Sequence, residues 1–180
     1  MTKHTCHFTA IGNHDILTNN TNYTNAFILP HNNPANTELY YSFTWGNAKF
    51  IALDGNIDYT AGSAQYTWLQ NELKCNDREW LFVFFHQTPW SNAWDASYYI
   101  PLTPFFLYEG NTDMRTSIVP LFEQYHVDFV LNGHTHDYQR GALNGVKYFI
   151  AGCGEASTPD IHTNNNAPNI QFEQDQNNYM

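Results

Sequence analysis

Three short motifs carry the side chains of this chain that could do chemistry. In order they are Gly-Asn-His-Asp at 12–15, His-Gln-Thr-Pro at 86–89 and Gly-His-Thr-His-Asp-Tyr-Gln-Arg at 133–140. Each motif places imidazole or carboxamide groups beside a Gly or Pro turn, and both groups bind transition metals. Two metals roughly 3.5–4 Å apart clamp phosphate oxygens and lower the pKa of a bound water, which is chemistry that cleaves phosphate esters. We therefore interpret the motifs as part of a dinuclear metal site.

The third motif gives the strongest signal. His134 and His136 are two residues apart, so in extended backbone both side chains leave the same face. Gly133 permits an unusual turn just before them. A lone His-x-His is common by chance, but this one follows an apolar segment and precedes Asp-Tyr-Gln-Arg. His86 also closes an apolar segment, with Pro89 fixing the chain direction after it, although alone it would suit an ordinary histidine at a strand end.

The first motif combines a possible ligand with a possible acid. The amide oxygen of Asn13 can bind a metal, which would place His14 near the substrate rather than on the metal. His14 would then act as general acid to the leaving oxygen or as a hydrogen-bond donor to a phosphate oxygen. Asp15 would orient His14 or cap a helix. Read alone, the four residues describe only a turn.

The elements that must position these motifs alternate between strands and helices, which predicts an α/β layered domain. Each motif follows a predicted strand, at 8–11, 80–85 and 127–131 respectively. Since sites in α/β sheets gather at the carboxyl ends of strands, we expect the three motifs to converge.

The remaining pattern fills in the domain. We expect strands at 39–45 and 49–53 joined as a hairpin, a helix at 63–73 capped by Ser63, a helix at 113–125 broken near Pro120, a strand at 147–151, and loops at 16–38, 54–62 and 91–112. The aromatic loop at 91–112 would cover the site or pack against a neighbouring domain. The domain would span 1–156, followed by a polar, Asn-rich and poorly ordered tail at 157–180.

Composition limits the partners. The chain has 180 residues, 7 Lys and Arg against 17 Asp and Glu, and a net charge of −10. With no basic run, this argues against nucleic acid or an anionic membrane as the main partner. No apolar stretch has the length of a transmembrane helix, and the N-terminus lacks a signal-peptide core. Three widely spaced cysteines form neither a disulfide framework nor a metal knuckle. The sequence does not decide the oligomeric state or compartment.

Taken in order, the three motifs resemble those of the calcineurin-like metallophosphoesterase superfamily, and Tyr138 and Arg140 resemble its purple acid phosphatase branch most closely. The resemblance covers roughly residues 8–155 and implies a layered β-sandwich flanked by helices. It also implies hydrolysis of phosphate monoesters by a metal-hydroxide mechanism, with small phosphorylated substrates and two metal ions, iron paired with iron, zinc or manganese. The same superfamily includes phosphodiesterases and nucleotidases, which use the same kind of site.

The resemblance assigns roles by position. Asn13, His86 and His134 would bind one metal and His136 the other, while His14 would be the acid or phosphate contact. Around them, Asp15, Tyr138 and Arg140 would support the ligand loops. An early Asp motif and a Gly-Asp motif, whose Asp bridges the metals and is followed by a Tyr ligand, have no match in this sequence. We therefore expect this chain to be the C-terminal portion of such an enzyme, without its first strands. The alternative is a degenerate module that binds phosphate, sugar or protein without catalysis.

Overall fold

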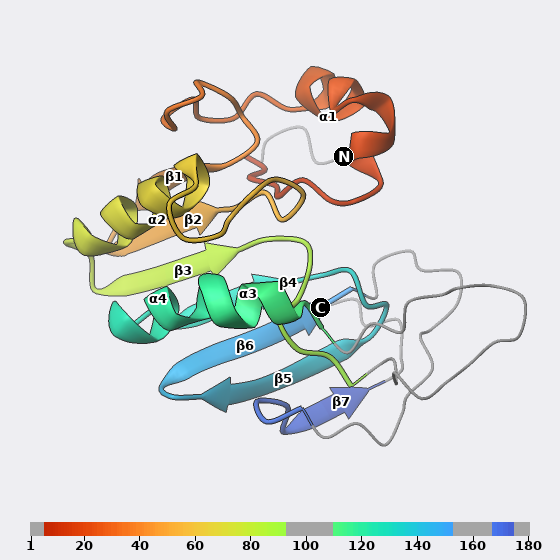
Figure 1. Ribbon diagram of the computed structural model, residues 1–180, viewed down its shortest axis with the longest axis vertical. Helices are drawn as coiled ribbons and strands as arrows, with labels where there is room; N and C mark the ends of the chain where they lie inside the picture. Colours follow the sequence, from red (N-terminus) through yellow and green to blue (C-terminus); the bar gives the residue numbers. More distant parts are fainter. Residues whose placement is uncertain (1–5, 93–109, 153–166, 175–180) are drawn as a thin grey trace, which may run out of the picture.

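The computed structural model describes residues 6–92, 110–152 and 167–174, which form a mixed α/β fold around one sheet (Figure 1). In the described residues the sheet has seven strands in the order β1-β2-β3-β4-β6-β5-β7. The strands are β1 Tyr41–Trp45, β2 Ala48–Ala52, β3 Trp80–Phe84, β4 Phe129–Asn132, β5 Tyr138–Leu143, β6 Val146–Ala151 and β7 Phe172–Gln174; the helices are the 3-10 helix η1 Asp15–Thr18, α1 Thr21–Ala26, α2 Ala64–Lys74, α3 Thr112–Ser117 and α4 Val119–Gln124.

The centre of the sheet is parallel. Strands β2, β3, β4 and β6 run in one direction, and β1, β5 and β7 pair antiparallel to their neighbours. Parallel pairs require crossover connections, and α2 supplies the one between β2 and β3, while α3 and α4 lie between β3 and β4. The carboxyl ends of β3 and β4 therefore meet at one edge of the sheet, as the sequence predicts.

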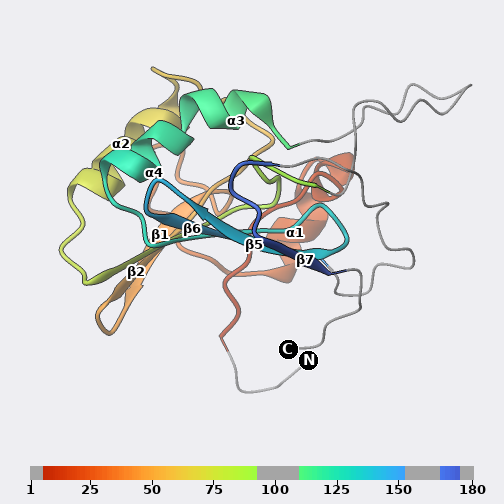
Figure 2. The same ribbon diagram turned by 90° about the horizontal axis from the view of Figure 1, so that it is seen from below.

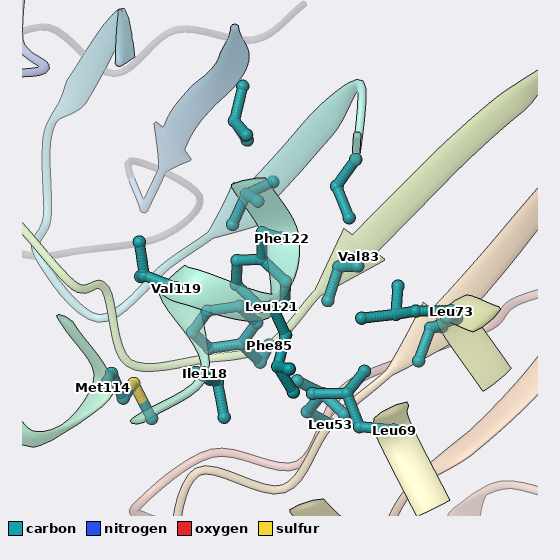
Figure 3. Close-up of a cluster of buried hydrophobic side chains, with 14 of the residues drawn as sticks. Leu53, Leu69, Leu73, Val83, Phe85, Met114, Ile118, Val119, Leu121 and Phe122 are labelled. Atoms are coloured by element: carbon teal, nitrogen blue, oxygen red, sulfur yellow. The ribbon is translucent and has the colours of Figure 1, made fainter. Parts of the chain in front are cut away.

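Helices α2, α3 and α4 cover one face of the sheet (Figure 2). The core lies between them, where Leu69 and Leu73 of α2 and Leu121 and Phe122 of α4 pack against Val83 (Figure 3). Each of these side chains is at most 3% exposed. This apolar layer fixes the direction of β3 and β4 and therefore the position of the loops that follow them.

Local signals explain where these helices begin and end. The Ser63 side chain accepts a hydrogen bond from the Tyr66 backbone N–H, the cap expected for α2. The predicted break near Pro120 is confirmed, because α3 ends at Ser117 and α4 begins at Val119 with the proline in its first turn.

Three expectations for the remaining segments need correction. Residues 8–11 form no strand. The Thr9 carbonyl oxygen accepts hydrogen bonds from the hydroxyls of Tyr23 and Tyr41, in place of a bond to a neighbouring strand. The loop expected at 16–38 contains η1 and α1. Within the expected tail, β7 adds a strand beside β5. Most of the predicted aromatic loop, 93–109, lies outside the described residues.

Few of the described residues cover the second face of the sheet. A ladder of stacked rings crosses it through Phe43, Phe50, Phe82 and Phe129, with ring centroids 4.8–4.9 Å apart. Ile11, Tyr23 and Leu29 cover the corner near Tyr41, and the Phe8 ring stacks on Phe43 with ring centroids 3.8 Å apart. The described residues thus form one sheet, where the resemblance implies a two-sheet sandwich.

Candidate metal centre

Three of the predicted ligands meet at the carboxyl edge of the sheet. The Asn13 Oδ1 lies 2.7 Å from His86 Nε2 and 3.3 Å from His134 Nδ1. The two ring nitrogens are 3.2 Å apart, and the imidazoles are nearly perpendicular, with an interplanar angle of 82°. One residue from each motif therefore presents a lone-pair atom to a common point, although the motifs are far apart in the sequence.

The ends of β3 and β4 position the two histidines. His86 follows β3, and its carbonyl oxygen accepts a hydrogen bond from the Gly133 N–H at 3.0 Å. Asn132, the last residue of β4, donates through Nδ2 to the carbonyl oxygens of Phe85 and Gln87. These bonds flank His86 on both sides and tie its loop to the third motif.

His134 adopts a strained backbone conformation. Its φ is 73°, and the Thr135 N–H donates to the Gly133 carbonyl oxygen at 2.9 Å. A positive central φ with this i to i+2 bond marks a classic γ-turn, which is rare for residues other than glycine. Strain of this kind persists where surrounding contacts enforce it, and it gathers at functional sites.

Gly12 allows the first motif to lie against the His86 ring. A methyl group at Gly12 would meet the ring at 3.1 Å from Nδ1 and 3.2 Å from Cγ. The Gly12 N–H donates to Asp15 Oδ2 at 2.8 Å, which closes the turn carrying Asn13. Asp15 therefore holds the turn.

The environment keeps His86 neutral. Burial, and after it the neighbouring His134, lower the pKa of His86 to about 4. His14 and His136 act in the same direction, and Asp15 opposes them. A neutral imidazole offers the lone pair that a metal needs. At neutral pH the His86 ring is therefore able to bind a metal ion without first losing a proton.

The other predicted residues lie around this cluster. His14 and His136 are close enough to influence His86 electrostatically, and His136 is exposed. Tyr138 and Arg140, on β5, both contact Phe172: the Tyr138 ring meets it edge-on at 6.1 Å, and the Arg140 guanidinium lies 5.0 Å above it. Their support of the ligand loop stays a prediction.

The donor set fits one metal ion. Adjacent ligands of an octahedral ion bound at about 2.1 Å lie roughly 3.0 Å apart, close to the 2.7–3.3 Å separations of the three atoms here. All three donors are neutral, however. Across the described residues, no group of three or more His, Cys, Asp or Glu side chains could hold a metal.

One polar residue near this site was not predicted. Asn56, in the loop after β2, donates to the Gly12 carbonyl oxygen at 3.3 Å and accepts from Gln87 Nε2 at 2.8 Å. It therefore joins the loops that carry Asn13 and His86. A single Asn in a polar loop gives no periodic or motif signal by which the sequence would reveal it.

A family model for calcineurin-like phosphoesterases matches residues 2–138, which include the three converging side chains. The chain belongs to this family. Within it, the chain is similar to purple acid phosphatases. It is 33% identical to purple acid phosphatase 23 of Arabidopsis thaliana over 137 residues, which is 73% of this chain and 27% of that protein. It is 32% identical to a phosphoenolpyruvate phosphatase of Allium cepa over 143 residues, which is 77% of this chain and 27% of that protein.

A solved structure shows the same fold. Purple acid phosphatase PPD1 from yellow lupin (Lupinus luteus) seeds matches with a TM-score of 0.65 at 22% identity, covering 85% of this chain and 29% of that one. The family and the mixed α/β architecture inferred from the motifs are thus confirmed. The chain spans less than a third of the length of these relatives. No helix in the described part of the chain is long and apolar enough to cross a membrane.

Proposed function

We propose that this chain supplies half of a dinuclear metal site in a protein that hydrolyses phosphate monoesters. The convergence of Asn13 Oδ1, His86 Nε2 and His134 Nδ1 within 2.7–3.3 Å carries the proposal. These three residues would hold one ion, and His136 would contribute to the second. The pair would be iron with iron, zinc or manganese, acting on a small phosphorylated substrate.

Each residue has a task that follows from its chemistry. When bound, the metals would supply positive charge for the phosphate oxygens and acidify a water molecule. Imidazole rings are uncharged when they bind a metal, so His86 and His134 would leave the net positive charge of the ions available to an anionic substrate. His14, beside the ligand Asn13, would donate a proton to the leaving oxygen or a hydrogen bond to a phosphate oxygen. Asp15 keeps the turn closed through Gly12 while this happens.

The missing charge compensation would come from polypeptide outside these 180 residues. A dinuclear centre on neutral ligands alone would leave several positive charges uncompensated, and hard cations prefer carboxylate oxygens. Parallel strands are normally covered on both faces, but here Trp45, Trp80, Leu131 and Phe172 are 38–73% exposed on the open face.

A hollow connects this open face with the metal ligands. It has a volume of about 530 Å³ and is lined by Phe43, Phe84 and Leu131 from the face and by His86 and Gly133 from the site. We propose that a second β-layer covers the face and brings the carboxylates to this edge. The greater length of the relatives supports this arrangement.

Metal content tests the proposal directly. The purified 180-residue chain would be incubated with Zn²⁺, Mn²⁺ or iron, desalted, and analysed for metal per chain. We expect at most one weakly held ion, lost in His86→Ala and retained in His126→Ala, a matched control at an exposed histidine after α4. Two tightly held ions would refute the need for outside carboxylates, and equal metal in wild type and His86→Ala would refute the site.

Activity separates hydrolysis from binding alone. A longer product of the same reading frame that restores Asp and Gly-Asp-x-x-Tyr motifs should hydrolyse p-nitrophenyl phosphate, and its His86→Ala variant should not. A second candidate is a module that binds phosphate without catalysis. The three neutral donors favour it, because they do not compensate the charge of a catalytic pair of metal ions. That module would bind inorganic phosphate but show no hydrolysis in any longer product.

A further inference from the structure

We infer that Asn56 is a positioning residue that holds the Asn13 and His86 ligands in register, a role that rests on the proposed metal site. Its side chain lies where three loops meet: the loop after β2, the turn at 12–15 and the loop after β3. Asn56 reaches the two ligands through their neighbours in the chain, Gly12 and Gln87.

The contacts of Asn56 use both ends of its amide. Nδ2 donates to the Gly12 carbonyl oxygen at 3.3 Å and to Asp54 Oδ1 at 2.9 Å. Oδ1 accepts from Gln87 Nε2 at 2.8 Å. Gly12 directly precedes Asn13, and Gln87 directly follows His86. One amide group therefore connects the residue before one ligand with the residue after the other.

The amide is itself anchored to the buried core. The Asn56 N–H also donates to Asp54 Oδ1, at 2.8 Å, and Asp54 is 1% exposed. The backbone of Asp54 exchanges two hydrogen bonds with the side chain of Gln65 in α2, at 2.8 and 2.9 Å. Gln65 is 2% exposed. The orientation of Asn56 is thus fixed through α2, which packs against the sheet that carries His86.

Close packing leaves this junction little freedom. A Cβ at Gly55 would lie 2.0 Å from Gln87 Oε1, so the loop after β2 can approach Gln87 only because residue 55 has no side chain. Burial also raises the pKa of Asp54, although its hydrogen bonds to Asn56 oppose that change. Polar groups that orient metal ligands typically change metal affinity by 10- to 100-fold when they are removed.

Asn56→Ala tests the role in two measurements. In the metal-free protein, the His86 and His134 rings are 5.1 Å apart by centroid, so NMR should show an NOE between them. We expect this NOE in wild type and its loss in Asn56→Ala. We also expect Co²⁺, monitored by its visible absorption bands, to bind 10- to 100-fold more weakly to the variant.

Three further variants separate positioning from general stability. Asn47 lies in the β1–β2 turn, and Asn47→Ala removes its exposed hydrogen bond to Glu79. This variant should leave the His86–His134 NOE and the Co²⁺ affinity unchanged. Asn56→Asp keeps the acceptor for Gln87 but loses the donor to Gly12, so it should behave like Asn56→Ala. Gln87→Ala cuts one connection only, and it keeps the test available if Asn56→Ala does not fold; it should show a smaller loss of affinity.

The outcomes are distinct. Asn56→Ala with an unchanged NOE and unchanged Co²⁺ affinity would overturn the inference, even if its melting temperature fell. So would a wild type without the NOE, or a lost NOE with unchanged affinity. If the NOE is lost in the variant but wild type holds no Co²⁺, the positioning role stands and the proposed metal function of this chain fails.

Discussion

The neutral state of His86 should make the metal-free protein sensitive to acid. The folded chain holds the pKa of this ring at about 4, and an unfolded histidine has a pKa near 6.5. Between these values the unfolded state binds more protons, so the free energy of unfolding rises with pH and is lost as the pH falls from about 6.5 towards 4.

The size of the effect follows from the same two values. Between pH 7 and pH 5, protonation of this ring in the unfolded state alone would lower the free energy of unfolding by about 2 kcal/mol. The His86 ring is only partly buried, so solvent screening reduces the expected loss to about 1 kcal/mol.

The assay is urea unfolding at pH 7, 6 and 5 in the presence of EDTA. The difference between wild type and His86→Gln isolates this ring, because buried carboxyls such as Asp54 titrate equally in both proteins. We expect wild type to lose about 1 kcal/mol more than His86→Gln over this range. His126→Gln removes an exposed histidine and should run parallel to wild type. If His86→Gln also runs parallel to wild type, His86 is not held neutral and the electrostatic reasoning fails.

Three other substitutions probe the site and the sheet. Gly12→Ala places a methyl group 3.1 Å from His86 Nδ1, so Co²⁺ should bind several-fold more weakly while far-UV circular dichroism stays the same; unchanged affinity would contradict the packing. Gly141→Ala places a methyl group 1.4 Å from the Asn169 carbonyl oxygen, so hydrogen exchange at Phe172 should accelerate, and unchanged exchange would show that β7 tolerates the side chain. Phe82→Lys interrupts the stacked rings of the open face, so binding of the dye ANS and self-association seen by light scattering should both fall; equal dye fluorescence would place the dye elsewhere.

Sequence predicts the elements whose signals are local. The β1–β2 hairpin follows from its alternation and from the Gly46-Asn47 turn, where Gly46 has a φ of 60°. The β5–β6 hairpin is not among the expected elements, although Asn144 and Gly145, with φ values of 50° and 89°, form the turn that most favours a hairpin. Strand β5 lies near the edge of the sheet and has a mostly polar sequence. Apolar content therefore does not identify it as a strand.

The short strand β7 is harder to foresee. Phe172–Gln174 is a three-residue segment in a polar region, and it becomes a strand only because β5 offers an edge. Tertiary pairing decides such segments, and local propensity does not.

Within the candidate site, too, some features follow from local sequence signals and others depend on the tertiary fold. The convergence of Asn13, His86 and His134 could be predicted from the motifs, because each motif places its polar side chain beside a turn at the end of an extended or strand segment. Asn56 could not, because its role depends on which loops the fold brings together. The γ-turn at His134 is equally hidden, since no rule of composition assigns a positive φ to a histidine there.

The proposed second layer would couple its own docking on the open face to the binding of metal. The strand residues on this face include two cations, Lys147 above Phe129 and Arg140 above Phe172, and no carboxylate lies among the described strand residues that share the face with them. A covering layer with an acidic edge would therefore meet complementary charge, and its carboxylates would reach the hollow beside His86. Since a ligand that binds only the assembled state stabilises it by mass action, metal should strengthen the docking of the proposed layer, and the layer should tighten the metal by the same factor.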